Sequence, residues 1–237
     1  MLVTRNLSKS FGKLVALDSV NAEMGAGQAI SLVGPNGSGK TTFIKCLLGL
    51  VTPDSGDILL DGQQVIGAWN YRQRIGYMPQ IGRFPDHMRV GQLFNMIKEI
   101  RQGAYQQLDE ELVNAFEIEK FANKTMRTLS GGMRQKVSAC LAFLFNPDIL
   151  ILDEPTAGLD PLSSEILKDK VQAEKTKGKL ILLTSHILSD LEDLTTDVLY
   201  IIDGNIQFFQ PIEALKARTG EQKLNRALAQ VMKEFRN

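Results

Sequence analysis

Two short runs of aliphatic residues constrain the fold more than any other feature of the sequence. Residues 149–152 (ILIL) and 180–184 (LILLT) are almost continuously apolar, which is typical of strands buried on both faces of a parallel sheet. Between them, Asp160 followed by Pro161 predicts the start of a helix, and Gly178 predicts its end. Strand, helix and strand in this order predict an α/β fold built on a parallel sheet.

Strand and helix patterns alternate along most of the rest of the chain. One segment shows helical spacing without strand patterns, which predicts a helical subdomain inserted at about residues 85–146. We expect this subdomain to interrupt a single domain over residues 1–210. The other predicted elements are strands at 29–33, 58–60 and 74–78, a helix at 41–50, and an edge hairpin joining 198–202 to 206–209.

The remaining residues, 211–237, form a predicted helical tail. Its apolar side chains share one helical face and comprise Leu224, Leu228, Val231 and Phe235. This pattern fits a helix that docks on the chain's own core. A dimer contact or a helix lying on a membrane surface is the alternative.

The composition excludes several classes of protein. The 27 basic and 27 acidic residues cancel, which argues against binding to nucleic acid or anionic lipid through bulk charge. Cys46 and Cys140 both fall among apolar residues of predicted helices, so we expect buried free thiols rather than a disulfide or a metal pair. No secretion signal and no apolar segment of about 20 residues is present, which predicts a soluble or peripheral protein.

A glycine-rich loop, GPNGSGKTT, lies between the predicted strand at 29–33 and the predicted helix at 41–50. Its spacing is that of a phosphate-binding loop, in which main-chain N–H groups surround a polyphosphate at the helix N-terminus. We expect Lys40 to contact the β- and γ-phosphates of ATP, Thr41 to bind Mg²⁺, and Thr42 to contact the α-phosphate. The predicted nucleotide-binding residues of this loop are Gly34, Pro35, Asn36, Gly37, Ser38, Gly39, Lys40, Thr41 and Thr42.

The segment ILILDEP places two carboxylates at the carboxyl end of a predicted strand, the edge at which parallel sheets bind ligands. Adjacent side chains there diverge, so they need different roles. We expect Asp153 to hold Mg²⁺ through its water shell and Glu154 to act as the general base. The alternative, a solvated turn that only ends the strand, is the minor interpretation once a phosphate loop lies upstream.

A second glycine-rich segment, LSGGM at residues 129–133, precedes a predicted helix that runs to about Phe145. Ser130 and the main-chain N–H groups of Gly131 and Gly132 predict a second phosphate contact, one that lacks a lysine. In the alternative interpretation Ser130 is only the N-cap of the helix. That alternative explains the serine but gives the two glycines no role.

With LSGGM followed by ILILDEP, residues 1–210 resemble a nucleotide-binding subunit of the ATP-binding cassette (ABC) superfamily. The resemblance implies a P-loop NTPase (RecA-like) core with an N-terminal antiparallel β-subdomain and the inserted helical subdomain. Within the superfamily the chain is most similar to ATPases of ABC-2-type exporters. A more particular similarity is to the ATPases of copper-processing exporters that serve nitrous oxide reductase maturation.

The resemblance also implies roles for isolated residues. Phe11 would stack on adenine, although a buried core position is the alternative. Gln80 would sense Mg²⁺ and connect the catalytic core to the helical subdomain, and Asp160 would communicate across a dimer while also capping its helix. His186 would contact the γ-phosphate, whereas His87 has no such placement and is predicted to be a loop residue.

The partners follow from the resemblance alone. Two copies would dimerise head to tail, so that ATP on Lys40 of one subunit is capped by Ser130 and Gly132 of the other. Separate transmembrane permease subunits would hold the dimer at the cytoplasmic face of the membrane, with no nucleic acid involved. The alternative is a soluble ABC ATPase of an assembly machine, such as the iron–sulfur cluster type.

Overall fold

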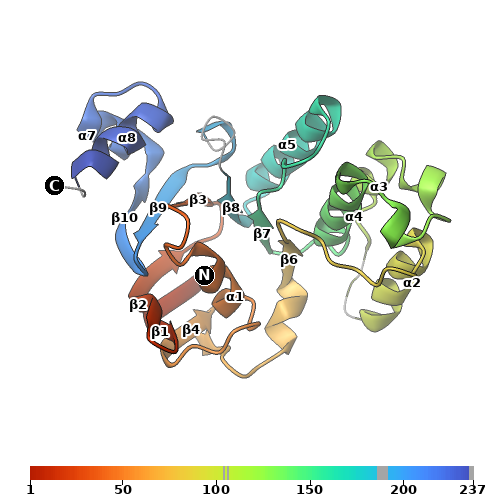
Figure 1. Cartoon of the computed structure of the whole chain (residues 1–237), viewed down its shortest axis with the longest axis horizontal. Helices are drawn as coiled ribbons and strands as arrows, with labels where there is room; N and C mark the ends of the chain where they lie inside the picture. Colours follow the sequence, from red (N-terminus) through yellow and green to blue (C-terminus); the bar gives the residue numbers. More distant parts are fainter. Residues whose placement is uncertain (104, 106, 186–191, 235–237) are drawn as a thin grey trace. The chain divides into compact units, whose positions relative to one another are not determined.

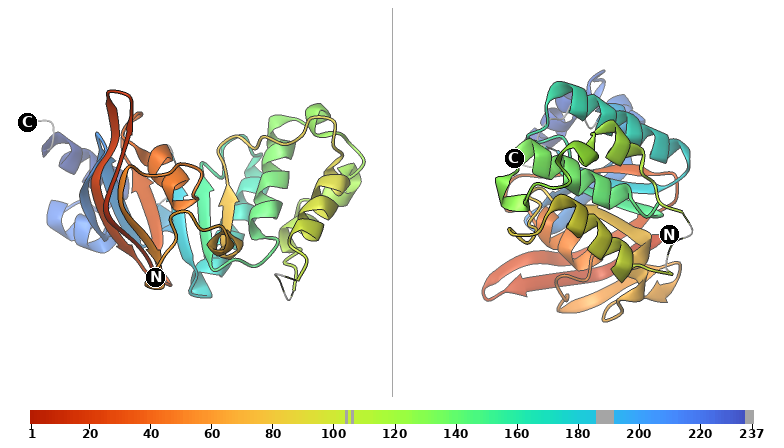
Figure 2. Two further views of the ribbon diagram at one scale, coloured as in Figure 1. Left: turned by 90° about the horizontal axis from the view of Figure 1, so that it is seen from below. Right: turned by 90° about the vertical axis from the view of Figure 1, so that its right-hand side faces the viewer.

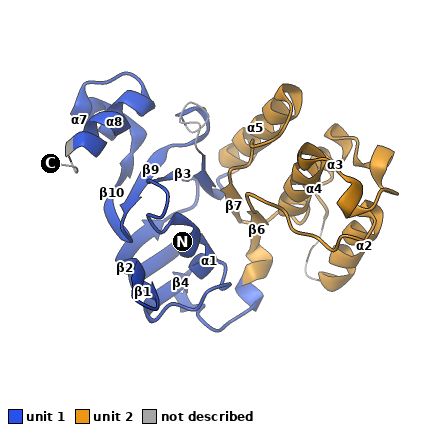
Figure 3. Ribbon diagram, in the orientation of Figure 1, with its two compact units in different colours: residues 1–71, 178–237 blue, residues 72–177 orange. Residues whose placement is uncertain are grey.

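The chain forms two units, shown in different colours in Figure 3. Unit 1 comprises residues 1–71 and 178–237, and unit 2 comprises residues 72–177. The structure is a computed structural model that describes residues 1–103, 105, 107–185 and 192–234. The predicted domain boundary at residue 210 stays a prediction.

Unit 1 contains an antiparallel sheet in the order β2-β1-β4-β5 (Figure 1). In β2, Val20, Ala22 and Met24 are buried and alternate with exposed residues, so one face of the strand is covered and the other is open to solvent. This sheet is the antiparallel β-subdomain that the resemblance implied. Its strands are β1 (Leu2–Phe11), β2 (Leu14–Met24), β4 (Ser55–Leu60) and β5 (Gln63–Gln64).

The second group of strands in unit 1 has the order β10-β9-β3-β8. β3 pairs in parallel with both β8 and β9, and all five residues of β8 are buried, as their aliphatic sequence predicted. The predicted hairpin is confirmed: β9 and β10 are antiparallel, and both turn residues, Asp203 and Gly204, have positive φ. The strands are β3 (Ala29–Val33), β8 (Leu180–Thr184), β9 (Asp197–Ile202) and β10 (Asn205–Pro211).

Three helices of unit 1 are α1 (Lys40–Leu47), α7 (Ile212–Thr219) and α8 (Leu224–Glu234). α1 directly follows the phosphate loop and ends three residues before the predicted limit, close to Gly49, whose φ is 64°. In the tail, α8 lies against α7 (Figure 1). Leu224, Leu228 and Val231 are fully buried there, whereas Phe235 lies outside the described residues.

Unit 2 combines two parallel strands with helices, seen from two further sides in Figure 2. α4 packs on β6, and a Cβ atom at Gly76 would lie 2.0 Å from the Ala142 carbonyl, so the helix approaches this closely only because residue 76 is glycine. The elements are β6 (Ile75–Met78), α2 (Val90–Ile100), α3 (Glu111–Ala115), α4 (Gly131–Phe143), β7 (Ile149–Asp153) and α5 (Pro161–Thr176). Short 3₁₀ helices span Ile118–Phe121 and Met126–Thr128, and another, Asn70–Arg74, begins two residues before unit 2.

Two expectations from composition can be compared with this fold. Cys46 on α1 and Cys140 on α4 are free and buried, as predicted. In the part of the chain that the structure describes, no helix is long and apolar enough to cross a bilayer.

Candidate functional site

The phosphate loop of unit 1 is shaped by two glycines, Gly34 and Gly39, that have no room for a side chain. A Cβ atom at Gly34 would lie 2.1 Å from the Ile201 carbonyl oxygen, and one at Gly39 would lie 2.4 Å from the Ala16 carbonyl oxygen. Gly39 also has a φ of 105°, which L-residues rarely adopt. The loop can therefore run against β9 and β2 only with glycine at these two positions.

Lys40 is the first residue of α1, and its side chain folds back over the loop. The ammonium Nζ donates hydrogen bonds to the carbonyl oxygens of Gly34 at 2.7 Å and Pro35 at 2.9 Å. Thr41 is exposed in the next position, and Thr42 is half-buried. The loop thus gathers a cation, two hydroxyls and the N–H groups of a helix start.

The side-chain hydroxyl of Ser38 is buried within the loop. The residue is 1% exposed, and its Oγ has no hydrogen-bond partner among the described residues. Its main chain is well anchored, because the carbonyl accepts a hydrogen bond from the N–H of Gly204 at 3.0 Å. A buried hydroxyl without a partner is costly, so this atom fits a loop that binds a polar ligand. With Lys40 and Thr41 beside it, the donor set suits a polyphosphate with Mg²⁺.

Phe11 ends β1 in the same unit and is 50% exposed. The alternative of a buried core position is therefore wrong for this side chain. Its ring lies 5.5 Å from the Nζ of Lys9, and Leu14 and Val15 beyond the turn are also exposed. The end of the β1–β2 hairpin thus offers an exposed aromatic face.

The two carboxylates of unit 2 lie at the carboxyl end of β7 as predicted but differ in surroundings. Asp153 ends the strand and is half-buried, whereas Glu154 is 9% exposed and has a φ of 52°. Burial of Tyr77 on the neighbouring β6, together with the negative charge of Asp153, raises the pKa of the phenol to about 12. Tyr77 is a neighbour of this site that the sequence did not indicate.

The second glycine-rich segment begins α4. Ser130 is its N-cap, and Oγ accepts a hydrogen bond from the N–H of Met133 at 3.2 Å, so the serine does cap this helix. A Cβ atom at Gly132 would lie 2.8 Å from the Gly158 carbonyl oxygen. Packing therefore requires this glycine, whereas Gly131 is exposed with open space around it. The predicted phosphate contact of the segment stays a prediction.

Two residues of α4 that the sequence reasoning missed contact the segment after β7. The Nε2 of buried Gln135 donates to the carbonyl oxygens of Glu154 at 3.3 Å and Pro155 at 3.5 Å. The Nζ of Lys136 lies 3.1 Å from a carboxylate oxygen of Asp160. Their spacing from Gly132, three and four residues, was the only sign in the sequence that they share a helix face with it.

Asp160 caps α5 as predicted. Its carboxylate accepts hydrogen bonds from the hydroxyl of Ser163 at 2.7 Å and from the Ser163 N–H at 2.9 Å. These bonds, with the ion pair to Lys136, hold the pKa of Asp160 well below its usual range. The carboxylate therefore stays charged near neutral pH.

The structure thus divides the predicted site residues between the units. Phe11 and residues 34–42 belong to unit 1, and the residues near the strand ends and helix starts of unit 2 form a second set. That set comprises Gln80, Ser130, Gly131, Gly132, Asp153, Glu154 and Asp160. Gln80 is exposed just after β6, and His186 lies outside the described residues.

Comparisons with known proteins agree on one family. Residues 17–157 match the family described as "ABC transporter". The Nod factor export ATP-binding protein I of Cupriavidus metallidurans is 34% identical over 225 residues, covering 93% of this chain and 74% of that relative. A solved ATP-binding subunit of an ABC transporter has a TM-score of 0.89 and 26% identity, covering 98% of this chain and 99% of its own. A dimeric bacterial ABC transporter cassette has a TM-score of 0.78 and 22% identity, covering 89% and 98%.

Proposed function

The chain belongs to the ABC transporter family as an ATP-binding subunit with ATPase activity, and from this premise we propose how its own residues carry out that activity. The ATP site is built on the phosphate loop. The observation that carries this assignment is the buried hydroxyl of Ser38, which has no hydrogen-bond partner among the described residues, in a loop where Gly34 and Gly39 leave no room for side chains. ATP phosphates would supply the missing partner.

Binding would exchange one set of hydrogen bonds for another. Lys40 now donates to two carbonyls of the loop, and phosphate oxygens offer its ammonium stronger, charged acceptors. Thr42 would contact the α-phosphate, and Phe11 would stack on the adenine. Thr41, Asp153 and Gln80 would hold Mg²⁺, and the cation would neutralise the charge that develops on the transferred phosphoryl group.

Hydrolysis would depend on Glu154 as the general base. The carboxylate would accept a proton from the attacking water, and its burial limits competition from bulk solvent. His186 stays a predicted contact of the γ-phosphate. Supporting this assignment, Glu154 is held in a φ that only surrounding contacts can maintain.

The mechanical role would require two copies of the chain. We infer a head-to-tail dimer in which Ser130, Gly131 and Gly132 of one subunit cap ATP bound by the other, with Asp160 communicating between them. Among solved structures of the same fold is a dimeric cassette.

Separate transmembrane permease subunits would hold the dimer at the cytoplasmic face of the membrane. The relative named as a Nod factor export protein supports export as the direction of transport. Nothing in the comparisons favours the iron–sulfur assembly alternative. The resemblance to copper-processing exporters stays a prediction, as does the cargo.

Replacing Glu154 with Gln tests this proposal. We expect ATP affinity within about twofold of the parental protein, because the phosphate loop is unchanged, and a fall in kcat of about 10²- to 10⁴-fold. Phosphate release measures kcat, and titration with a fluorescent ATP analogue measures affinity. Glu165→Gln is the matched control, because it makes the same chemical change at an exposed position of α5. Parental hydrolysis by Glu154→Gln would refute the role of Glu154 as base.

A further inference from the structure

We propose that Gln135 is a positioning residue for ATP hydrolysis. Its side-chain amide holds the main chain at Glu154 and Pro155, and thereby sets the direction in which the Glu154 carboxylate points. This inference rests on the proposed role of Glu154 as general base.

The backbone of Glu154 is in a conformation that its own sequence disfavours. A φ of 52° is left-handed, a conformation that is unfavourable for a non-glycine residue. The next residue is Pro155, and a residue before proline is normally driven toward extended backbone. Both the residue type and the following proline therefore disfavour the backbone conformation of Glu154, so contacts with other residues must maintain it.

Gln135 supplies such a contact from 19 residues away in the sequence. Its Nε2 donates at 3.3 Å to the Glu154 carbonyl, which also accepts the N–H of Ala157 at 3.1 Å, and at 3.5 Å to the Pro155 carbonyl. Carbonyls of consecutive residues constrain the rotation of the peptide plane between them. Because Gln135 is 5% exposed, water is a poor substitute for its donors.

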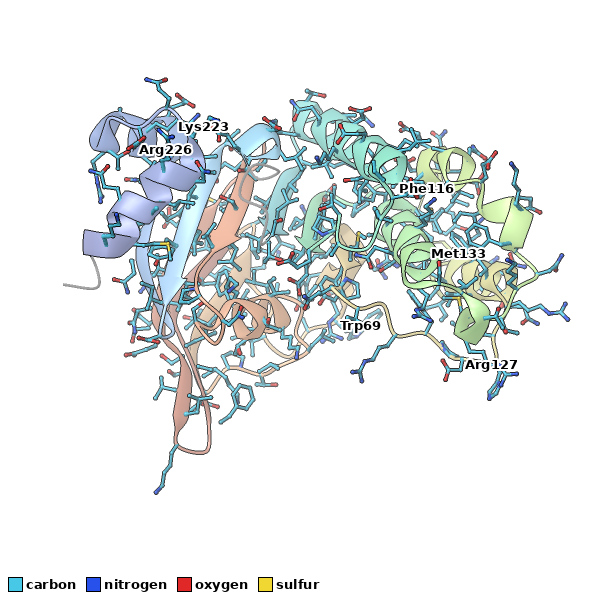
Figure 4. The ribbon with its side chains drawn as sticks, turned by 45° about the horizontal axis from the view of Figure 1, so that its top comes forward. Trp69, Phe116, Arg127, Met133, Lys223 and Arg226 are labelled. Carbon is cyan, nitrogen blue, oxygen red and sulfur yellow. The ribbon has the colours of Figure 1, made fainter. Side chains whose placement is uncertain are left out.

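The contact belongs to a continuous seam along one face of α4. Gly132, Gln135 and Lys136 are spaced at i, i+3 and i+4, and they meet Gly158, the Glu154–Pro155 main chain and Asp160 in turn. Met133, labelled in Figure 4, marks the first turn of this helix, which Ser130 caps. A movement of the N-terminal end of α4, where Ser130 lies, would therefore shift Gln135 and, through its hydrogen bonds, the main chain of Glu154.

The alternative is that Gln135 only stabilises the fold as a satisfied buried amide. The two roles differ in what they change. A purely structural role lowers the free energy of unfolding and affects ATP binding and hydrolysis through the fraction of folded protein. A positioning role lowers kcat in fully folded protein, and acts only through the carboxylate of Glu154.

The test combines Gln135→Met, which keeps the side-chain length but removes the amide, with Glu154→Gln. We expect Gln135→Met to bind a fluorescent ATP analogue within about twofold of the parental protein and to lose kcat on the order of 10- to 100-fold. In the Glu154→Gln background, single-turnover hydrolysis should be unchanged by Gln135→Met, because the group being positioned is already gone. Gln172→Met makes the same chemical change at an exposed position of α5 and should keep the parental kcat.

Two results would overturn the inference: a parental kcat for folded Gln135→Met, or a full further loss when it is combined with Glu154→Gln. Normal hydrolysis by Glu154→Gln alone would instead refute the proposed function. If Gln135→Met does not fold, Gln135→Glu preserves the side-chain shape, and its carboxyl can donate a hydrogen bond only when protonated. The ratio of its kcat to the parental kcat should then rise as the pH falls; a constant ratio would count against the inference.

Discussion

The buried thiols show how a single residue's surroundings set its chemistry. Cys46 and Cys140 are each 1% exposed, on α1 and α4 respectively. Burial raises the pKa of the Cys46 thiol to about 11, the nearby Lys9 cation opposing the shift, and burial raises the pKa of Cys140 well above its usual range. Both groups are therefore neutral thiols at physiological pH.

We expect neither thiol to react with a disulfide reagent at pH 7.5 until the protein unfolds. The raised pKa of Cys46 also predicts that its contribution to the free energy of unfolding is complete below about pH 9 and is lost as the pH rises toward about 11. Urea titrations across this range check the sign, with Cys46→Ala as the control that removes the ionisation. Rapid labelling of the folded protein would contradict the prediction.

At the scale of elements, an ion cluster around the buried Lys170 ties α5 to the segment that begins α3. Lys170 on α5 is 1% exposed in its side chain and lies 2.6 Å from Asp109, 2.6 Å from Glu111 and 3.0 Å from fully buried Glu174. Burial by itself would lower the pKa of Lys170, but the three carboxylates raise it above its usual range. The Asp109 N–H also donates to the Leu144 carbonyl at 2.8 Å, which connects the end of α4 to the same cluster.

Replacing Lys170 with Met should therefore destabilise the protein strongly. Removing one partner of a buried ion pair costs about 3–5 kcal/mol, and we expect the lower end because Lys177 still lies 2.7 Å from Glu174. Lys168→Met is the control, since Lys168 pairs with an exposed carboxylate and its loss should cost about 1 kcal/mol or less. Urea unfolding followed by circular dichroism measures both, and equal losses for the two variants would disprove the special role of the cluster.

A second element-scale feature is the seam between α4 and the segment after β7. The sequence predicted both segments and their glycine and carboxylate residues, but not the contacts between them. The close approach of Gly132 to the Gly158 carbonyl is enough to require glycine at this position, whether or not nucleotide is bound. Such contacts depend on how a helix lies against a loop about twenty residues away, which periodicity within either segment does not encode.

At the scale of the whole molecule, the proposed dimer predicts the behaviour of Ser130→Arg. The Glu154→Gln protein, with Ser130 unchanged, should form an ATP-dependent dimer, as measured by size-exclusion chromatography with light scattering. Ser130→Arg should keep ATP binding to the monomer and abolish the dimer, because a bulky cation would occupy the surface that caps the partner's nucleotide.

Ser130→Ala separates this effect from the loss of the helix cap. Both substitutions remove the hydrogen bond from Met133, which is worth about 1 kcal/mol, but only arginine adds bulk. We therefore expect Ser130→Ala to dimerise with ATP. A Ser130→Arg variant that loses ATP binding as a monomer would place the segment at its own subunit's nucleotide and refute the head-to-tail arrangement.

The sequence by itself determined the local elements and the chemistry that they carry. Continuous aliphatic runs predicted β7 and β8, Asp160 and Pro161 predicted the start of α5, and the glycine loop predicted the nucleotide-binding residues, because short-range periodicity and turn chemistry depend on neighbours along the chain. Only the tertiary structure decided what holds Glu154, which polar atom of the loop has no hydrogen-bond partner among the described residues, and why Gly132 is glycine. Those answers depend on atoms from distant segments brought within about 3 Å, where close packing and buried hydrogen bonds rather than local preference determine the geometry.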